Sequence, residues 1–289
     1  MKHRAGLLPL LAGALAWMLL SALSPAVESF APGVQAEVTV LMYHSIVTRD
    51  SYAGMYAVPL SRLEDDLAGL QARGYHFVSP RMLLDFVDEG AALPEKPVLL
   101  TFDDGYRNNF TLLPGLLEQY DAYGVVAVVG RYCDAAPSPE TDTSPHIGIG
   151  WEELAKIAAD CPRLTLASHS YDLHETGPRL GSGLLPGESQ AHWQEVFCRD
   201  AQRMAQTLEE HLGFRPWIYA YPYGVIAPGA DDLLRAMGVR MTFSCQEARC
   251  LLRQGDGSCL LSMGRFNRDG RLSSGEFLER MEGNAPAAQ

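Results

Sequence analysis

The sequence predicts an α/β fold, namely a single distorted (β/α) barrel of about seven to eight mostly parallel strands. From Val38 onward, short apolar runs alternate with segments of helical periodicity, which is typical of βα units around a parallel sheet. About eight such apolar runs occur, and this number suits a barrel. The chain has 289 residues, of which 47% are hydrophobic, so it is long enough to bury one large core.

The predicted strands are short apolar runs, most of them bounded by polar, Gly or Pro residues. In chain order they span residues 38–43, 76–79, 98–102, 125–129, 164–168, 218–221, 241–244 and 261–263. Helical periodicity predicts helices over residues 62–73, 80–89, 110–120, 151–160, 189–212, 228–237 and 275–281. The first helix has a capping-box pattern at Ser61 and Glu64, ends before Gly74, and carries an apolar stripe of Leu63, Leu67 and Leu70.

Residues 1–36 are predicted to be a signal peptide or an N-terminal membrane anchor. Lys2 and Arg4 precede an apolar stretch over residues 5–23, and small and polar residues follow as far as Ala36. The apolar stretch is long for a cleaved signal, so an uncleaved anchor is the alternative to cleavage. Both alternatives place residues 37–289 outside the cytoplasm, in the periplasm or the extracellular space, with or without attachment to the inner membrane.

The charge balance argues against nucleic acid as a partner. Lys and Arg together number 23 and Asp and Glu number 35, which gives a formal net charge of −12. Such a protein repels a phosphate backbone. After residue 36 no second apolar run approaches membrane-spanning length, so contact with a membrane is expected only through the N-terminal segment.

The cysteine count predicts disulfides. All six cysteines lie in the predicted exported part, and an even number of cysteines in an oxidising compartment favours pairing, although the connectivity stays open. A zinc site built from cysteines is the alternative, but the sequence contains no C-x-x-C pair. The six residues are Cys133, Cys161, Cys198, Cys245, Cys250 and Cys259.

Two adjacent carboxylates follow one of the predicted strands. The run over residues 98–102 ends in Asp103, Asp104 and Gly105. The carboxyl ends of parallel strands are where α/β folds place their active sites. A lone Asp-Asp-Gly is explained more simply as a polar turn, so a second motif has to decide between the two interpretations.

Two histidines follow another predicted strand and supply that second motif. The run over residues 164–168 leads into His169, and His174 comes five residues later. This spacing does not place two side chains on one helical face, so the rings converge only if the loop bends back. One carboxylate oxygen and two imidazole nitrogens make a three-ligand set for a hydrolytic divalent metal. Together with the two carboxylates, the histidines favour a metal site over two ordinary histidines.

These motifs resemble the polysaccharide deacetylases of carbohydrate esterase family 4, which share the NodB homology domain. The resemblance covers about residues 38–281, nearly all of the predicted exported part, and it implies that residues 37–289 form a catalytic domain. Residues 41–46 (LMYHSI) resemble the opening strand of the family. The two histidines are five residues apart in the sequence SHSYDLH, which is similar to the motif of the branch that acts on poly-N-acetylglucosamine.

The resemblance implies a role for each motif residue. Residues 101–105 (TFDDG) are similar to the first family motif, which implies that Asp103 is the catalytic base and Asp104 a metal ligand. The segment HSYDLH is similar to the second motif, which implies that His169 and His174 complete the metal site.

The third family motif is kept only in part. The segment YPYG is similar to the family's Arg-x-Pro-Tyr, which implies that the backbone N–H of Tyr223 helps to bind the oxyanion. The family's Arg falls at Ala220, so Arg265, which follows the last predicted strand, is the candidate replacement, with a surface Arg as the alternative. The family's late Leu-x-x-His, its usual general acid, is absent, and the acid stays unidentified.

Four further residues are candidates for lining the site. His44, at the end of the first predicted strand, is either a pocket residue or a structural histidine. Tyr171, Trp217 and Tyr221 are candidates for stacking on sugar rings, and core packing is the alternative, above all for Trp217.

The resemblance implies a metal-dependent hydrolase that removes N-acetyl groups from an N-acetylglucosamine-containing polysaccharide. A divalent ion would polarise the acetamide carbonyl and activate water; zinc is expected, with iron, cobalt or nickel as alternatives. Three other functions stay open: an O-acetyl polysaccharide esterase, a catalytically weak carbohydrate-binding relative, and a metal-free structural domain. Exopolysaccharide, peptidoglycan and chitin fragments all remain candidate substrates.

Overall fold

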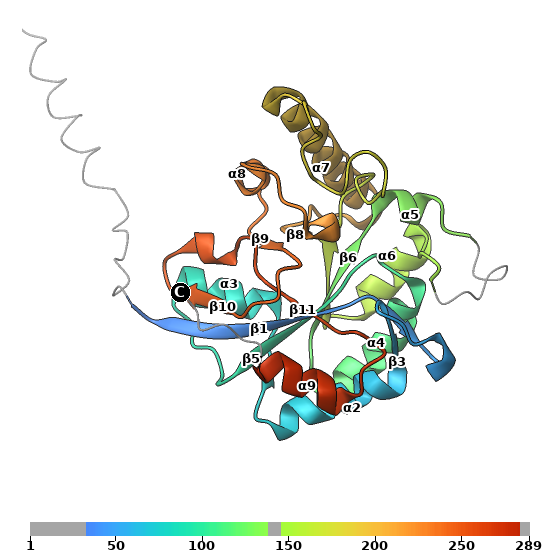
Figure 1. Cartoon of the computed structure of the whole chain (residues 1–289), viewed down its shortest axis with the longest axis vertical. Helices are drawn as coiled ribbons and strands as arrows, with labels where there is room; N and C mark the ends of the chain where they lie inside the picture. The colour runs from blue at the N-terminus through green and yellow to red at the C-terminus, as the bar shows by residue number, and fades with distance from the viewer. Residues whose placement is uncertain (1–32, 138–145, 284–289) are drawn as a thin grey trace, which may run out of the picture. The chain divides into compact units, whose positions relative to one another are not determined.

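A curled, mostly parallel sheet forms the centre of the computed structural model (Figure 1). The structure describes residues 33–137 and 146–283. The strand order is β10-β1-β5-β6-β7-β8-β9, with β4 added beside β5 and β11 beside β1. All neighbours in this order are parallel except β10, which runs antiparallel to β1. The predicted α/β fold is confirmed, as a half-barrel with seven strands in its main path.

The strands are short and lie close to the predicted runs. Those of the main path are β1 (Gln35–Tyr43), β5 (Pro97–Phe102), β6 (Gly124–Val128), β7 (Leu164–Ser168), β8 (Ile218–Ala220), β9 (Met241–Phe243) and β10 (Cys250–Arg253). The added strands are β4 (His76–Phe77) and β11 (Phe266–Asn267). A separate parallel pair is formed by β2 (Ser45–Val47) and β3 (Ala57–Pro59).

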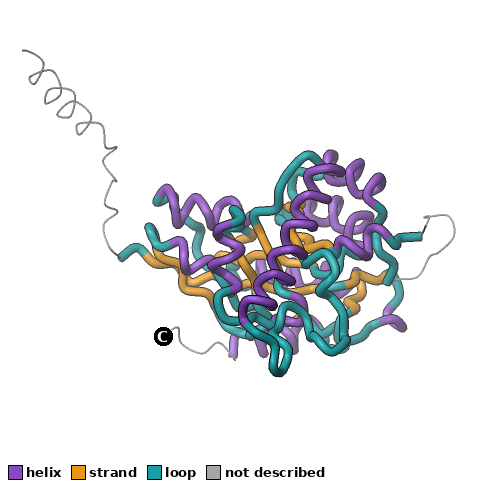
Figure 2. The backbone as a smooth tube through the Cα atoms, turned by 90° about the horizontal axis from the view of Figure 1, so that it is seen from above, coloured by secondary structure: helices purple, strands orange, loops and turns teal. Residues whose placement is uncertain are grey.

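Helices surround the sheet, as Figure 2 shows from above. They are α2 (Leu60–Ala72), α3 (Pro80–Glu89), α4 (Arg107–Gln119), α5 (Gly130–Asp134), α6 (Trp151–Asp160), α7 (Gln190–Leu212), α8 (Ala230–Ala236) and α9 (Ser274–Gly283). Three short 3₁₀ turns complete the described elements, namely η1 (Asp50–Tyr52), η2 (Pro222–Gly224) and η3 (Gly257–Leu260).

Side chains alternate between two faces of the sheet, and both faces are buried. In β5, Leu100 and Phe102 pack in the cluster that also contains the apolar stripes of α2, α4 and α6, whereas Leu99 packs in a second cluster with the buried residues of α3. All six residues of β5 are buried. Burial on both faces explains why this strand is a continuous apolar run in the sequence rather than an alternating one.

The helix predictions are confirmed apart from their ends and one cap. The predicted bounds 80–89 and 151–160 are those of α3 and α6, and the leucine stripe of α2 is fully buried. The capping box at Ser61 is wrong: α2 begins at Leu60, its N-cap is Pro59, and no side chain caps it. Because β3 runs up to Pro59, the chain enters the helix two residues earlier than predicted, and Ser61 lies inside the first turn.

The predicted strand over residues 261–263 is also wrong. Ser262 adopts φ +53°, which breaks an extended run, and Met263 makes only a single bridge to Phe243. That edge of the sheet is built instead from β10 and β11, which flank β1. Both strands are too short to give a period-two signal in the sequence.

The predicted disulfides are absent, since all six cysteines lie in the described residues and all are free thiols. They sit on different elements, and several thiols contact other groups. Cys250 Sγ donates to Gly264 O at 3.4 Å, and Cys245 Sγ lies 3.7 Å from Met42 Sδ. Burial raises the pKa of the Cys133 and Cys250 thiols to about 12, so both are unreactive.

The predicted signal peptide or anchor lies almost wholly outside the described residues, which begin at residue 33. Its last two residues belong to the sheet, because Gln35 and Ala36 pair with Arg253 and Leu252. Within residues 33–137 and 146–283, no helix has both the length and the hydropathy needed to cross a membrane.

Candidate active site

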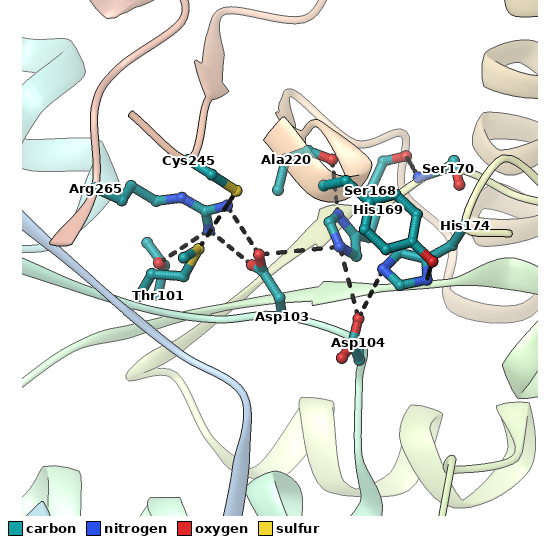
Figure 3. Close-up of polar contacts among 12 residues, drawn as sticks. Thr101, Asp103, Asp104, Ser168, His169, Ser170, His174, Ala220, Cys245 and Arg265 are labelled. Carbon is teal, nitrogen blue, oxygen red and sulfur yellow. Dashed lines mark hydrogen bonds and ion pairs between the residues drawn. The ribbon is translucent and has the colours of Figure 1, made fainter. Parts of the chain in front are cut away.

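The three sequence motifs meet at the carboxyl edge of the sheet. Asp103 and Asp104 follow β5, His169 follows β7, and Tyr223 lies in η2 directly after β8. Because β5 to β8 are parallel, their carboxyl ends lie at the same edge. Figure 3 shows the two imidazoles on one side of the carboxylates and Arg265 on the other.

The backbone is strained where each motif turns away from its strand. Asp104, Ser170 and Tyr223 have φ values of +72°, +70° and +57°, the left-handed region that residues with a Cβ rarely adopt. Strain of this kind costs ~1–3 kcal/mol per residue and is found at functional sites. Gly105 continues the first turn with φ +67°, and a Cβ there would lie 2.8 Å from Val128.

Asp104, His169 and His174 form a cluster with the composition of a metal site. Their ligand atoms all lie within 4.8 Å of one another. Asp104 Oδ1 is 3.1 Å from His174 Nε2 and 3.7 Å from His169 Nε2. This oxygen is buried and has no hydrogen-bond partner among the described residues. An orphaned carboxylate oxygen that faces two imidazole nitrogens fits a divalent cation with N/O ligands.

Hydrogen bonds fix the orientation of both imidazoles. His169 Nδ1 donates to Ala220 O at 2.8 Å. The Tyr132 hydroxyl donates to His174 O at 3.0 Å and accepts from His174 Nδ1 at 3.2 Å. Each ring therefore turns its Nε2 towards Asp104, the arrangement that outer partners impose on metal-binding histidines. Burial lowers the pKa of His169 to about 4, so this ring is neutral and can act as a ligand.

Asp103 lies beside this cluster and is paired with Arg265. The guanidinium donates to both carboxylate oxygens, at 2.7 and 2.8 Å, and both side chains are buried. Arg265 is itself held by Ser244 O at 2.9 Å and Thr101 Oγ1 at 3.2 Å. Burial alone would raise the pKa of Asp103, but Arg265 and then His169 outweigh it, so the pKa lies below its usual value.

A cavity of ≈ 450 Å³ opens above these residues. Its lining includes Asp103 and the three residues of the cluster, together with His44 and three tyrosines, Tyr56, Tyr106 and Tyr223. Tyr56 and Tyr223 are 53% and 37% exposed, so their rings are accessible to a ligand. The Tyr223 ring also packs on His174, with a centroid distance of 4.7 Å.

His44 lines the pocket, whereas the sequence left open whether it is a pocket residue or a structural histidine. Its Nδ1 is buried without a hydrogen-bond partner among the described residues, and its ring lies 4.6 Å from that of Tyr56. Burial lowers the pKa of His44, so it is neutral near pH 7. The sequence signal for this residue was its place directly after Tyr43, the last residue of β1.

The aromatic residues suggested for sugar stacking are not the ones exposed at the site. Tyr171 and Tyr221 are only 4% and 0% exposed, because both pack in the core. Trp217 lines a different cavity, beside His211 and Phe214. The exposed rings that line the pocket are those of Tyr56 and Tyr223, on segments without a periodic apolar pattern.

Fold and site together define a class of protein, an enzyme built on a curled α/β sheet with carboxylates and imidazoles gathered at its carboxyl edge. Family comparison narrows this class. The family described as polysaccharide deacetylase matches residues 90–242, more than half of the chain. The chain therefore belongs to the polysaccharide deacetylase family, and the family predicted from the motifs is confirmed. The match includes the residues of both acidic and histidine motifs but ends before Arg265.

One curated relative and two solved structures are similar to this chain, the structures in fold. Poly-beta-1,6-N-acetyl-D-glucosamine N-deacetylase of Escherichia coli K12 is 26% identical over an alignment of 226 residues, which covers 71% of this chain. The chain spans about a third of that relative's length, since 33% of it is covered. A de-N-acetylase from Aggregatibacter actinomycetemcomitans has a TM-score of 0.70 at 22% identity, with 85% of this chain and 100% of that one covered. IcaB from Ammonifex degensii has a TM-score of 0.66 at 24% identity, with 85% and 96% covered.

Proposed function

We propose that this deacetylase is metal-dependent and removes N-acetyl groups from a poly-N-acetylglucosamine polysaccharide outside the cytoplasm. The observation that carries the proposal is the cluster of Asp104, His169 and His174 beside the Arg-paired carboxylate of Asp103. Amide hydrolysis needs an activated water and a polarised carbonyl, and a metal ion bound to these three side chains would supply both.

Asp103 is the base in this proposal. Its pairing with Arg265 keeps the carboxylate ionised, so it can take a proton from a water molecule in the pocket. The backbone N–H of Tyr223 donates a hydrogen bond to the carbonyl oxygen as negative charge develops on it. Loss of such a donor typically lowers the rate about 10²–10³-fold. Asp103 then returns its proton to the departing amine, and the unpaired Nδ1 of His44 is available to hydrogen-bond that amine.

The choice of substrate rests on the relatives and on the pocket. The E. coli relative carries poly-beta-1,6-N-acetyl-D-glucosamine in its name. The exposed rings of Tyr56 and Tyr223 give the pocket apolar faces on which a pyranose ring can lie, next to the groups that would act on its acetamide. Export is inferred from residues 1–36, and zinc is the ion inferred from the ligand types.

One experiment tests the metal and the substrate together. The full chain is purified, its metal content is measured, and acetate and free amine are quantified with poly-β-1,6-N-acetylglucosamine, chitin oligomers, peptidoglycan and an O-acetylated xylan. We expect one metal per chain and equimolar acetate and amine from the first substrate. Acetate release from xylan alone, without new amine, would show that the protein is an O-acetyl esterase. Full turnover by the metal-free protein would show that the reaction does not need a metal.

A further inference from the structure

The loop between the two histidines has to bend sharply, and its own sequence does not explain how it is held. Residues 170–174 are neither helix nor strand. The chain leaves β7 at Ser168 and reverses at Ser170, whose φ is +70°. In Figure 3 the imidazoles at the two ends of this loop both turn towards Asp104. A loop in a strained conformation keeps it only if contacts from outside the loop fix it.

Most of the loop's backbone N–H groups donate to side chains. Within the loop, Ser170 N–H donates to Ser168 Oγ at 3.3 Å, and Leu173 N–H donates to Ser170 Oγ at 3.2 Å. The carbonyl oxygens of Ser170 and Tyr171 accept from the first two backbone N–H groups of α5 at 3.1 and 2.9 Å. The two N–H groups in the middle of the loop, those of Tyr171 and Asp172, have their acceptor elsewhere.

That acceptor is a single carboxylate on α7. Asp200 Oδ1 accepts from Tyr171 N–H at 2.9 Å, and Asp200 Oδ2 accepts from Asp172 N–H at 2.7 Å. Asp200 is 8% exposed and lies on the buried face of α7, between Phe197 and Met204, where every other buried residue is apolar. A charged side chain on such a stripe is unusual, and the two N–H groups account for its presence.

We infer that Asp200 is a positioning residue for the metal site, which holds the loop in the conformation that directs His169 and His174 towards Asp104. It touches neither the pocket nor the three ligand residues. The inference rests on the metal-binding part of the proposed function. Loss of an outer contact that orients metal ligands typically weakens metal binding 10–100-fold.

Two variants test this role, with a control on the same helix. Asp200→Ala removes both acceptors, and Asp200→Asn keeps the volume of the side chain but only one oxygen. Glu195→Gln changes an exposed carboxylate of α7 that pairs with Arg199 and does not reach the loop. Folding of each full-length variant is checked by circular dichroism and a cooperative melt.

The first measurement is amide hydrogen exchange of the metal-free proteins. In both Asp200 variants, exchange at Tyr171 and Asp172 should accelerate at least tenfold, more in Asp200→Ala than in Asp200→Asn, while exchange in β6 and β7 stays as in the wild type. A merely structural role would raise exchange throughout α7 and the sheet. Unchanged exchange at these two amides in a folded Asp200→Asn protein would overturn the inference.

The second measurement is zinc affinity by competition with a chromogenic chelator. We expect 10–100-fold weaker binding in the Asp200 variants, unchanged binding in Glu195→Gln, and recovery of turnover in Asp200→Asn at saturating zinc. Affinity within twofold of the wild type would refute a positioning role. If the wild type itself binds no zinc, the proposed metal site fails, whereas the exchange data still decide whether Asp200 holds the loop.

Discussion

Asp103 and Asp104 are neighbours in the chain but contact different partners, so replacing each should have a different effect. Asp104 faces the two imidazoles, whereas Asp103 is held by Arg265. We expect Asp103→Asn to keep its metal while turnover falls about 10²–10⁴-fold, and Asp104→Asn to lose both. Atomic absorption measures the metal content of each variant, and acetate release measures its turnover. Equal metal loss in the two variants would contradict the division of roles.

Among the described residues, Arg265 and Arg268 are two buried arginines that each pair with a buried aspartate, and the second pair provides a control. Arg268 donates to both oxygens of Asp66 at 2.7 and 3.1 Å, away from the pocket lining. Removing either arginine leaves a buried carboxylate unpaired, so Arg265→Met and Arg268→Met should each lower the free energy of unfolding by about 3–5 kcal/mol.

Only the first of these variants should change the chemistry. In Arg265→Met, Asp103, the proposed base, loses the charge that keeps it ionised, and turnover per folded molecule should fall at least tenfold, on the order of 1.4 kcal/mol or more. Arg268→Met should keep turnover per folded molecule. Denaturant unfolding and initial rates at a temperature where both variants are folded provide the test, and equal rates in both would make Arg265 purely structural.

Tyr56 allows the polysaccharide contact to be tested separately from the chemistry. Its ring is exposed, lines the pocket and packs against His44, whereas Tyr52, which is also exposed, does not line the pocket. Tyr56→Ala should lower kcat/KM for poly-N-acetylglucosamine about tenfold, the effect of losing ~1.4 kcal/mol of ring contact. A small acetyl ester should be turned over normally, and Tyr52→Ala should behave as the wild type. A parallel loss on both substrates would show that Tyr56 supports the fold of the pocket instead.

The loop over residues 177–187 packs against η2, and one carboxylate holds it. A Cβ on Gly181 would lie 2.4 Å from Pro222 O, so the two segments touch directly. Glu188 Oε2 accepts from Leu185 N–H at 2.9 Å, and Oε1 pairs with Arg179 and with His192 Nδ1. The Arg179 guanidinium, followed by the Leu185 N–H, lowers the pKa of Glu188 to about 2.

A depressed carboxyl pKa has a defined effect on stability. The contribution of Glu188 is fully present above its unfolded pKa of 4.5 and is lost as the pH falls towards 2. Glu188→Gln should therefore be less stable than the wild type at pH 6, and the difference should shrink steadily between pH 4.5 and 2. Urea unfolding across this range measures it, with Glu195→Gln, which changes an exposed carboxylate on the following helix α7, as the control. A difference that does not change with pH would mean that Glu188 acts through shape and not through charge.

The helices and the central strands could be predicted from the sequence because their signals are local. An apolar stripe such as that of α2, or a continuous run such as β5, is set by residues a few positions apart. The strands β10 and β11 were missed, because four- and two-residue strands carry no period and depend on pairing with β1, more than 200 residues earlier in the chain. The disulfide prediction failed for a related reason, since a cysteine count contains no information on which thiols come near one another.

In the site, too, features set by local sequence could be predicted and features set by distant contacts could not. The clustering of Asp104 with His169 and His174 could be predicted, since each motif sits beside a strand end and parallel strands bring their ends together. The residues that orient these side chains could not be predicted. Tyr132 and Asp200 reach the second motif from α5 and α7, and neither belongs to a recognisable pattern around its own position. For Asp200 a signal did exist, a carboxylate on an apolar helical stripe, but its partners are backbone groups that no sequence shows.

The polar site and the hydrophobic core are separate parts of the molecule. The main apolar clusters lie on the two faces of the sheet, whereas the metal-type cluster lies beyond the strand ends, on loops. Protein contacts hold these loops, namely those made by Asp200, the Tyr132 hydroxyl and Ala220 O. Such a site differs from a structural zinc site, in which the ligands themselves bring the chain together.

Removal of the metal should therefore abolish turnover without unfolding the protein. A metal that binds only the native state at about 100 times its dissociation constant adds ~2.7 kcal/mol of stability, so the metal-free protein should melt at a lower temperature but still cooperatively. The test is dialysis of the full chain against dipicolinate, followed by circular dichroism, calorimetry and acetate release before and after zinc is returned. We expect an unchanged far-ultraviolet spectrum, a lower melting temperature, and recovery of activity on reloading. A metal-free chain without native circular dichroism would mean that the ion organises the sheet edge, and that the loop contacts cannot hold the ligands on their own.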